Sequence, residues 1–191
     1  GGGGAVINGK ATFVRCIIQN NTMQANGAPN SYGGGLYFSG GEHIIRNCIV
    51  ATNDVLNAGT ANQGDGIYSA ASALQVEQST IVRNRGEGLR CGSGITTATN
   101  SIFWANGDDI AGTITLGYSC IQNGDNNGTN GCLMVDPLFA DTTYYHLLSK
   151  AGYYAGGFFS GGMWIAQGVS ELTSPLIDAG APSSPWSWRP P

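Results

Sequence analysis

Charged residues are scarce in this chain. They make up 10% of its 191 residues, well below the about 25% that is usual in a soluble domain. The formal net charge is −4, and positive charge gathers only at Arg83, Arg85 and Arg90. Proteins that bind nucleic acid need larger basic patches to neutralise phosphates. We therefore expect no nucleic-acid partner.

Long apolar runs are also missing. No stretch approaches the about 20 consecutive apolar residues that a membrane-spanning helix requires, so no membrane span is expected. Nothing in the sequence resembles a signal peptide. The chain begins at Gly1 inside a repeat and ends on two prolines. Such ends are expected of a mature product or of a piece of a longer protein.

Cysteine occurs in an odd number, five, so at least one thiol has no partner within the chain. Cys120 and Cys132 bracket a turn-rich loop and form the predicted disulfide, which would favour an extracellular protein. Cys16 and Cys48 occupy equivalent positions of two repeats, and a strand spacing of about 4.8 Å places them within disulfide reach. Stacked parallel cysteines more often remain thiols, and the states of Cys16, Cys48 and Cys91 are left open.

The chain contains a repeated sequence unit. A small residue, an isoleucine, usually a second apolar residue and a nearby asparagine recur along the sequence. The copies are CIIQN (16–20), CIVATN (48–53), TIVRN (80–84), SIFWAN (101–106) and, more weakly, CIQN (120–123). Self-similarity at intervals of a few tens of residues indicates a stacked architecture.

A second, glycine-based repeat runs in step with the first. It reads GGGLY (33–37), GDGIY (64–68) and GEGLR (86–90), and GGGAV (2–6) fits the same frame. The spacing gives a basic repeat of roughly 20–22 residues, lengthened in two copies by about ten. The polar stretches 22–32 and 54–63 are the natural places for these insertions.

Short strands account for this pattern. Apolar segments alternate with Gly and Asn, which tolerate the positive φ of tight corners, and no stretch has helical periodicity. Such a chain is expected to form an all-β parallel β-helix, in which each strand pairs with its equivalent on the next coil. We predict about five to six coils over residues 1–141. An irregular aromatic segment over residues 142–191 would flank or cap the same domain.

Equivalent side chains of stacked coils form columns. One column holds small residues, a second on the same face is apolar, and a third holds asparagines that can hydrogen-bond along the stack. The predicted small column is Cys16, Cys48, Thr80, Ser101 and Cys120. The predicted apolar column is Ile18, Val50, Val82 and Phe103. The predicted asparagine column is Asn20, Asn53, Asn84 and Asn106.

An isoleucine column should face the opposite way, because side chains alternate along a strand. It would form an apolar stripe on the outside of the coil, which is typical of an interface. Either the C-terminal segment of the chain covers this stripe or the stripe mediates self-association. Its predicted members are Ile17, Ile49, Ile81, Ile102 and Ile121.

Three acidic residues suggest a cation site. Asp65, Glu87 and Asp109 recur at one-coil intervals, and stacked carboxylates repel each other unless water or a cation separates them. A Ca²⁺ ion held by carboxylates and carbonyl oxygens at a corner is one explanation. The other is that all three are exposed turn residues splayed into water, in which case no cofactor is required.

The last third of the chain departs from the simple repeat. Two repeat segments, NSIFWAN (100–106) and YSCI (118–121), lead into it. The segments that follow are DPLF (136–139), YHL (145–147), SP (174–175) and IDAG (177–180). Together they resemble the closing section of right-handed parallel β-helix proteins of the pectate-lyase-like superfamily. The resemblance covers nearly the whole chain and implies a bacterial protein that is secreted or held at the cell surface. That superfamily includes polysaccharide lyases, glycoside hydrolases and adhesins, so the resemblance implies a fold more than a function.

Catalysis would require a base beside acidic groups. The candidate catalytic residues are Arg83, Arg85, Glu87, Arg90, Asp108 and Asp109. The polygalacturonase motifs Asn-Thr-Asp, Gly-His-Gly and Arg-Ile-Lys do not occur in the sequence, and His43 and His146 lie in separate regions. A polysaccharide lyase or glycoside hydrolase is therefore the alternative to the preferred function.

Binding and assembly are the remaining readings. Tyr37, Tyr68 and Trp104 could stack on the sugar rings of a glycan. An open β-helix exposes unpaired strand edges, and the sequence contains no cap ahead of its first repeat. We therefore predict an extracellular structural or adhesive protein that associates head to tail with copies of itself into a filament or surface layer. An extracellular polysaccharide is the other expected partner.

Overall fold

The computed structural model describes residues 4–24, 31–56, 62–154, 158–160, 163–165 and 168–182. The chain divides into two compact units, Gly1–Met134 and Val135–Pro191, and each is described by itself. This division falls before the predicted boundary between residues 141 and 142. Gly1, the closing prolines and parts of the two predicted insertions lie outside the described residues.

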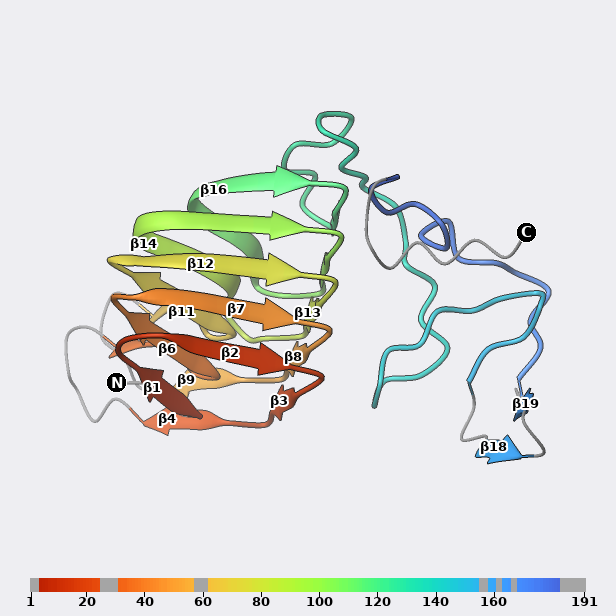
Figure 1. Ribbon diagram of the computed structural model, residues 1–191, viewed down its shortest axis with the longest axis horizontal. Helices are drawn as coiled ribbons and strands as arrows, with labels where there is room; N and C mark the ends of the chain where they lie inside the picture. The colour runs from red at the N-terminus through yellow and green to blue at the C-terminus, as the bar shows by residue number, and fades with distance from the viewer. Residues whose placement is uncertain are drawn as a thin grey trace. The chain divides into compact units, whose positions relative to one another are not determined.

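Short strands on successive coils build the first unit (Figure 1). The first coil contains β1 (Ala5–Ile7), β2 (Ala11–Val14), β3 (Ile17–Gln19) and β4 (Thr22–Gln24). The second contains β5 (Ser31–Tyr32), β6 (Leu36–Ser39), β7 (Glu42–Arg46), β8 (Ile49–Ala51) and β9 (Asp54–Leu56). The third contains β10 (Asn62–Gln63), β11 (Ile67–Ala70), β12 (Ser72–Glu77) and β13 (Thr80–Val82). The last two contain β14 (Glu87–Thr99), β15 (Ile102–Trp104), β16 (Asp108–Gly117) and β17 (Cys120–Ile121).

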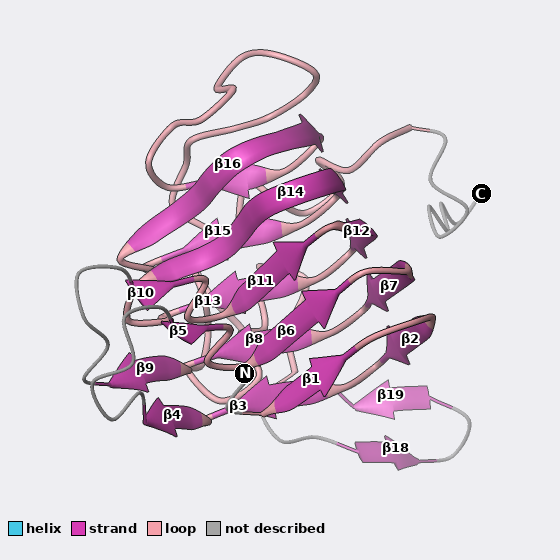
Figure 2. Cartoon of the chain, turned by 90° about the vertical axis from the view of Figure 1, so that its left-hand side faces the viewer, coloured by secondary structure: helices cyan, strands magenta, loops and turns pink. Residues whose placement is uncertain are grey.

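Each strand pairs with its counterpart on the neighbouring coil. One sheet has the order β1-β6-β11-β14-β12-β7-β2, with β16 on β14, and another has the order β17-β15-β13-β8-β3. β14 and β16 are long and turn through two sides of the coil, so they join what are separate strands in the earlier coils (Figure 2). A register shift between Cys91 and Thr96 marks the bend in β14.

The predicted all-β fold with parallel sheets is confirmed. Every described strand pair in the first unit is parallel, and the described residues contain no helix. Accordingly, we find no helix in the described part of the chain with the length and apolar character needed to cross a membrane.

Alternation along each strand sends every second side chain into the coil. The column that starts at Ile18 continues through Val50, Ile81, Phe103 and Ile121. All but the half-buried Ile18 are completely buried. Burial of a side chain of this size stabilises a fold by about 1.5–3 kcal/mol. This column is therefore a main source of cohesion between coils.

A ladder of small polar side chains lines one corner of the coil. The backbone N–H of each member donates to the Sγ or Oγ of the next: Cys16 to Cys48 (3.4 Å), Cys48 to Ser79 (3.1 Å), Ser79 to Ser101 (3.2 Å) and Ser101 to Ser119 (3.2 Å). Each side chain in turn donates to the carbonyl two residues before it. The predicted small column is thus correct at Cys16, Cys48 and Ser101, and is wrong by one residue at Thr80 and Cys120.

An asparagine ladder lines the next corner. The side-chain amides donate in one direction, from Asn21 to Asn53 (2.9 Å), from Asn53 to Asn84 (3.0 Å) and from Asn84 to Asn106 (2.9 Å). Asn106 then donates to the carboxylate of Asp109 at 2.9 Å. The predicted column is confirmed except at its first member. Asn20 lies one residue earlier, where its Oδ1 accepts from Thr52 at 2.7 Å.

Both corners use a left-handed residue just before the ladder residue. These residues are Arg15, Asn47, Gln78, Asn100 and Tyr118 at the first corner, and Asn20, Thr52, Arg83 and Ala105 at the second, with φ between 49° and 58°. A side chain with a Cβ pays a steric penalty in this region. The stacked hydrogen bonds of the ladders hold these corners in place.

The predicted outer isoleucine stripe is wrong at two positions. The outward column reads Ile17, Ile49, Thr80, Ile102 and Cys120. Ile81 and Ile121 are fully buried in the core column, because a shift of one residue moves a side chain to the opposite face. Ile17 is 47% exposed, whereas Ile49 and Ile102 are half-buried, so the apolar stripe is interrupted.

The predicted Cys120–Cys132 disulfide does not form, and all five cysteines are thiols. Leu133 pairs with Cys120, which aligns Cys132 with Ser119. Because neighbouring positions point to opposite faces, the Cys132 side chain enters the core and the Cys120 side chain faces the other way. Cys16 is half-buried, and Cys48 and Cys91 are buried.

The second unit contains little regular structure. Its described strands are β18 (Phe158–Ser160) and β19 (Met163–Ile165), which pair antiparallel. A second connection runs between Phe139 and Leu147, where the N–H of Ala140 donates to the carbonyl of His146 at 2.7 Å. The aromatic stretch predicted here is described only in part, and the side chains of 155–162 lie outside the described residues.

Candidate functional site

Tyrosines and charged residues gather on the outer face of the sheet that contains β6, β11 and β14. The pairing places Tyr37 beside Tyr68 and Tyr68 beside Arg90. The Tyr37 and Tyr68 rings are stacked, with centroids 5.6 Å apart. Tyr32, from β5, packs on Tyr68 with a centroid distance of 4.5 Å. Three rings from two coils therefore form one aromatic cluster.

Tyr68 is only 8% exposed, so it cannot present a ring face to a sugar. Tyr37 is half-buried within the same cluster. Trp104 is also half-buried but lies on β15, in the other sheet. The structure therefore joins Tyr37 and Tyr68 with Tyr32 and leaves Trp104 apart from them.

Two ion pairs border the aromatic cluster. Arg90 contacts the Glu87 carboxylate through Nη1, and the other oxygen of Glu87 accepts from the N–H of Gly64 at 2.6 Å. Arg85 Nη1 lies 3.2 Å from Asp54 Oδ2. The Arg85 side chain is 65% exposed, whereas those of Arg90 and Glu87 are 29% and 16% exposed. Arg85 is thus the accessible cation of the site.

Asp65 is the buried acid of this region, with 1% exposure. Its Oδ2 accepts from the N–H groups of Gly86 (2.9 Å) and Val55 (3.3 Å). Its Oδ1 finds no hydrogen-bond partner among the described residues, and the same holds for Oδ1 of Asp54. Burial is the largest cause that raises the pKa of Asp65, and the charges of Asp54 and Glu87 add to it against the two amide hydrogen bonds. The resulting pKa is about 6, which would suit a group that exchanges a proton near neutral pH.

Asp108 and Asp109 form hydrogen bonds with Gln122 and Asn123 rather than with the residues of this site. Glu87 lies opposite Asp108 in the pairing of β14 with β16, so Asp109 is one residue out of the predicted acidic column. Asp109 is 2% exposed, and its Oδ2 accepts from the N–H groups of Gln122 (2.7 Å) and Asn123 (3.2 Å). Burial raises its pKa despite these bonds and the one from Asn106. Asp108 is exposed and accepts from the Asn123 side chain at 2.9 Å.

The predicted Ca²⁺ ligands are not brought together. Asp65, Glu87 and Asp109 each accept from different backbone amides, as described above. No three His, Cys, Asp or Glu side chains within the described ranges are close enough to hold a metal ion. Both oxygens of the buried Asp109 accept hydrogen bonds, whereas only the Oδ2 of Asp65 does so among the described residues.

Of the predicted catalytic residues, Arg85, Glu87 and Arg90 belong to this site. Arg83 sits at the preceding corner with φ of 56° and makes no ion pair with the described residues. Sequence reasoning missed Asp54 and Tyr32. Asp54 directly follows the ladder residue Asn53, and Arg85 directly follows the next ladder residue, Asn84. Alignment of the repeats on these asparagines would have predicted the Arg85–Asp54 ion pair.

A second arrangement that the sequence did not predict lies in the second unit. The ring of His146 is 2.7 Å from Asp141, from Nδ1 to Oδ2, in a pocket lined by tyrosines. The five-residue spacing of these two residues is a weak signal on its own, because a turn must fold back to join them.

No protein-family model, curated protein or solved structure matches this chain.

Proposed function

We propose that this protein is a secreted structural or adhesive protein that associates head to tail with copies of itself. Its fold would be a right-handed parallel β-helix similar to those of the pectate-lyase-like superfamily. Parallel pairing of equivalent strands and stacked polar ladders support this reading. Such coils make a rigid, repetitive body suited to a mechanical or display role.

The open edge of the first coil carries the proposal. Within the described residues, β1, β2 and β3 each pair on one side only. The side chains that these strands turn inward are only half-buried, namely Ala5, Ile7, Phe13, Cys16 and Ile18. The equivalent side chains of the second coil are buried. An exposed strand edge beside exposed apolar side chains favours pairing with another strand.

A second copy of the chain provides a matching surface. β16 belongs to the same sheet as β1 and β2 and pairs only with β14 among the described residues, so a stacked copy would continue the parallel pairing along it. The contact would lie beside the corner where Asn130 donates to the Leu116 carbonyl and Leu133 pairs with Cys120. Contact between two different surfaces of identical chains does not close on itself and extends into a filament. A filament or surface layer is thus the expected assembly.

Neighbouring residues on β1 provide a sharp test. Ile7 faces the core at the open edge, and Val6 faces outward with 55% exposure. We expect light scattering and negative-stain electron microscopy to show concentration-dependent filaments for the wild-type protein and for Val6→Lys. Ile7→Lys should remain monomeric, because a charge would enter the contact.

Circular dichroism and thermal unfolding must show that Ile7→Lys is folded. A wild-type protein that stays monomeric at every concentration would refute the proposal. So would filaments that form equally well with Ile7→Lys.

A carbohydrate-active protein is the second candidate. The observation that favours it is the Arg85 side chain, which is 65% exposed and lies 3.2 Å from Asp54. The buried Asp65 carboxyl, with a pKa of about 6 that the charges of Asp54 and Glu87 help to raise, belongs to the same region. We would assay β-elimination on polygalacturonate with and without added Ca²⁺. Turnover that is lost in Arg85→Ala and retained in Lys10→Ala, whose side chain is 76% exposed, would establish this candidate.

A further inference from the structure

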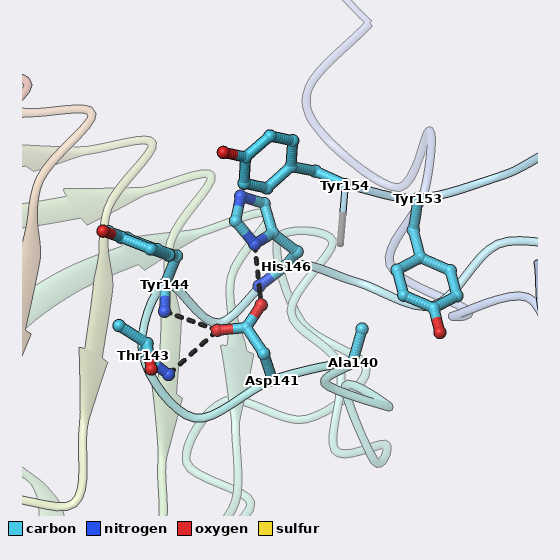
Figure 3. A pocket seen from close by; sticks show the side chains of 7 residues that line it. All are labelled: Ala140, Asp141, Thr143, Tyr144, His146, Tyr153 and Tyr154. Carbon is cyan, nitrogen blue, oxygen red and sulfur yellow. Dashed lines mark hydrogen bonds and ion pairs between the residues drawn. The ribbon is translucent and has the colours of Figure 1, made fainter. Parts of the chain in front are cut away.

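A pocket of about 340 Å³ opens in the second unit (Figure 3). This volume lies at the small end of the range of about 300–1,000 Å³ typical of ligand sites. Aromatic side chains dominate the lining, and all of it comes from one short stretch of chain. The lining residues are Ala140, Asp141, Thr143, Tyr144, His146, Tyr153 and Tyr154.

A single carboxylate organises the pocket. Asp141 Oδ1 accepts from the N–H groups of Thr143 (2.8 Å), Tyr144 (2.5 Å) and Tyr145 (3.1 Å). Its Oδ2 accepts from the N–H of His146 (3.2 Å) and from the Nδ1 of the same residue (2.7 Å). Partial burial opposes the charged form, but these hydrogen bonds outweigh it and lower the pKa of Asp141 to about 2.

The bond to Asp141 fixes the histidine. An ionised carboxylate only accepts, so Nδ1 of His146 donates to it and Nε2 of the neutral ring is an acceptor. The ring lies between Tyr144 and Tyr154, at centroid distances of 5.7 Å and 4.7 Å. Figure 3 shows the other edge of the ring directed away from Asp141. The side chain is 32% exposed, so a ligand can reach it.

Tyr153 is positioned from the opposite side of the pocket. Its backbone pairs with Gly168, N–H to carbonyl at 3.0 Å and 3.3 Å. A Cβ on Gly168 would lie only 2.3 Å from the Tyr153 ring. The ring therefore rests directly on this glycine, and a larger residue would displace it.

We propose that this pocket binds one pyranose ring of a neutral saccharide. The tyrosine rings supply flat apolar faces for the C–H face of the sugar, and their hydroxyls supply polar contacts. Nε2 of His146 accepts a hydrogen bond from a sugar hydroxyl.

Charge complementarity selects a neutral ligand. Among the residues that the structure describes, the lining contains no Lys or Arg that could pair with a uronate or phosphate. The Asp141 carboxylate already accepts five hydrogen bonds, so it is not available to a metal ion or an ammonium group. The site is independent of the open strand edge of the first unit, and either proposal can fail without the other.

The test uses the full chain and isothermal titration calorimetry. The probes are the tetrasaccharides of β-1,4-linked glucose, mannose and galactose, with tetragalacturonate and tetramethylammonium as charged comparisons. We expect at least one neutral probe to bind. Tyr144→Ala should weaken that binding about tenfold or more, because Tyr144 is 49% exposed and its loss should leave the fold intact.

Three further variants separate ligand contact from folding. Tyr118→Ala, at a 41% exposed tyrosine of the first unit, should bind like the wild-type protein. His146→Ala should lose affinity through the lost acceptor, and Gly168→Ala should lose affinity although every lining side chain is kept. The proposal fails if no neutral probe binds, if only a charged probe binds, or if Tyr144→Ala binds as tightly as the wild-type protein.

Discussion

Asn84 and Asn106 are joined by a side-chain hydrogen bond, 2.9 Å from Nδ2 to Oδ1, within a ladder that crosses four coils. Asn84 is 1% exposed, and its Oδ1 accepts from both the side chain and the N–H of Asn53. Its Nδ2 also donates to the carbonyl of Val50 at 3.1 Å. One side chain on the third coil thus satisfies polar groups of both neighbouring coils.

Replacement of Asn84 by Ala should be strongly destabilising. It removes the Oδ1 acceptor of the two Asn53 donors and the Nδ2 donor of the Val50 carbonyl, and each buried group left unsatisfied costs about 1–3 kcal/mol. Asn106 Oδ1 keeps the backbone N–H of residue 84. We expect a loss of about 3 kcal/mol in the free energy of unfolding, measured by urea denaturation. The control is Asn20→Gly, at an exposed corner with φ of 58°, which should cost less than about 1 kcal/mol. Equal losses would show that the ladder adds nothing specific.

Cys48 should tolerate serine but not valine. Its Sγ accepts from the N–H of Cys16 and donates to the carbonyl of Arg46, as the Ser79 hydroxyl does for Cys48 and Glu77. Cys48→Ser should therefore change stability by less than about 1 kcal/mol, whereas Cys48→Val should cost about 1–3 kcal/mol by leaving an N–H unsatisfied. Thermal unfolding of the two variants and the wild-type protein measures these differences. A Cys48→Val variant more stable than Cys48→Ser would contradict the prediction.

Asp65 should make the protein less stable as the pH rises. Its pKa is raised in the folded protein from 3.8 to about 6, so unfolding releases a proton between these values. The free energy of unfolding should fall from about pH 4 to about pH 6 and then level off. Asp65→Asn should remove this pH dependence of the free energy of unfolding. The variant should be more stable than the wild-type protein by about 1–3 kcal/mol at pH 7.5 but not at pH 4.

Urea denaturation at a series of pH values measures this difference. Glu42→Gln, at a side chain that is 75% exposed, serves as the control for loss of a negative charge. A gap between Asp65→Asn and the wild-type protein that does not change with pH would contradict the assignment.

Gly41 and Gly128 both have positive φ, 81° and 76°, but only one is crowded. A Cβ on Gly41 would lie 1.6 Å from the carbonyl oxygen of Gly9 on the preceding coil, whereas nothing lies within 4 Å of one on Gly128. Gly128→Ala should cost about 1–2 kcal/mol from backbone strain alone. Gly41→Ala should cost at least about 2 kcal/mol more or prevent folding, and similar melting temperatures would show that the coils can move apart.

The repeats predicted the parallel all-β fold because strand pairing requires regular spacing, and regular spacing is visible in a sequence. They did not predict the register. Thr80 resembles Cys48 in its local sequence, yet Ser79 pairs with Cys48 because it supplies the hydroxyl that accepts the N–H. That one-residue difference buries Ile81, and it is why the apolar stripe was misplaced.

The candidate site was predicted less completely than the fold. Arg85, Glu87 and Arg90 were found because they are charged and close in sequence. Asp54 was not, because it lies 31 residues before Arg85 in the sequence and meets it only where the coils stack. The corners were also hidden, because Arg15, Gln78 and Tyr118 adopt positive φ where residue type alone favours Gly or Asn.

The two polar ladders also bear on how such a chain can change length in evolution. Cys16, Cys48 and Ser79 each donate the backbone N–H to the Sγ or Oγ of the next ladder residue. Asn21, Asn53 and Asn84 each donate Nδ2 to the Oδ1 of the next asparagine. Removal or duplication of a whole coil therefore rejoins like with like and leaves no orphaned donor. Loss of a ladder residue alone breaks the stack, whereas the longer connections between Asn21, Asn53 and Asn84 leave it intact. Genes for proteins of this design should therefore change length by complete turns or within the loops between ladder residues.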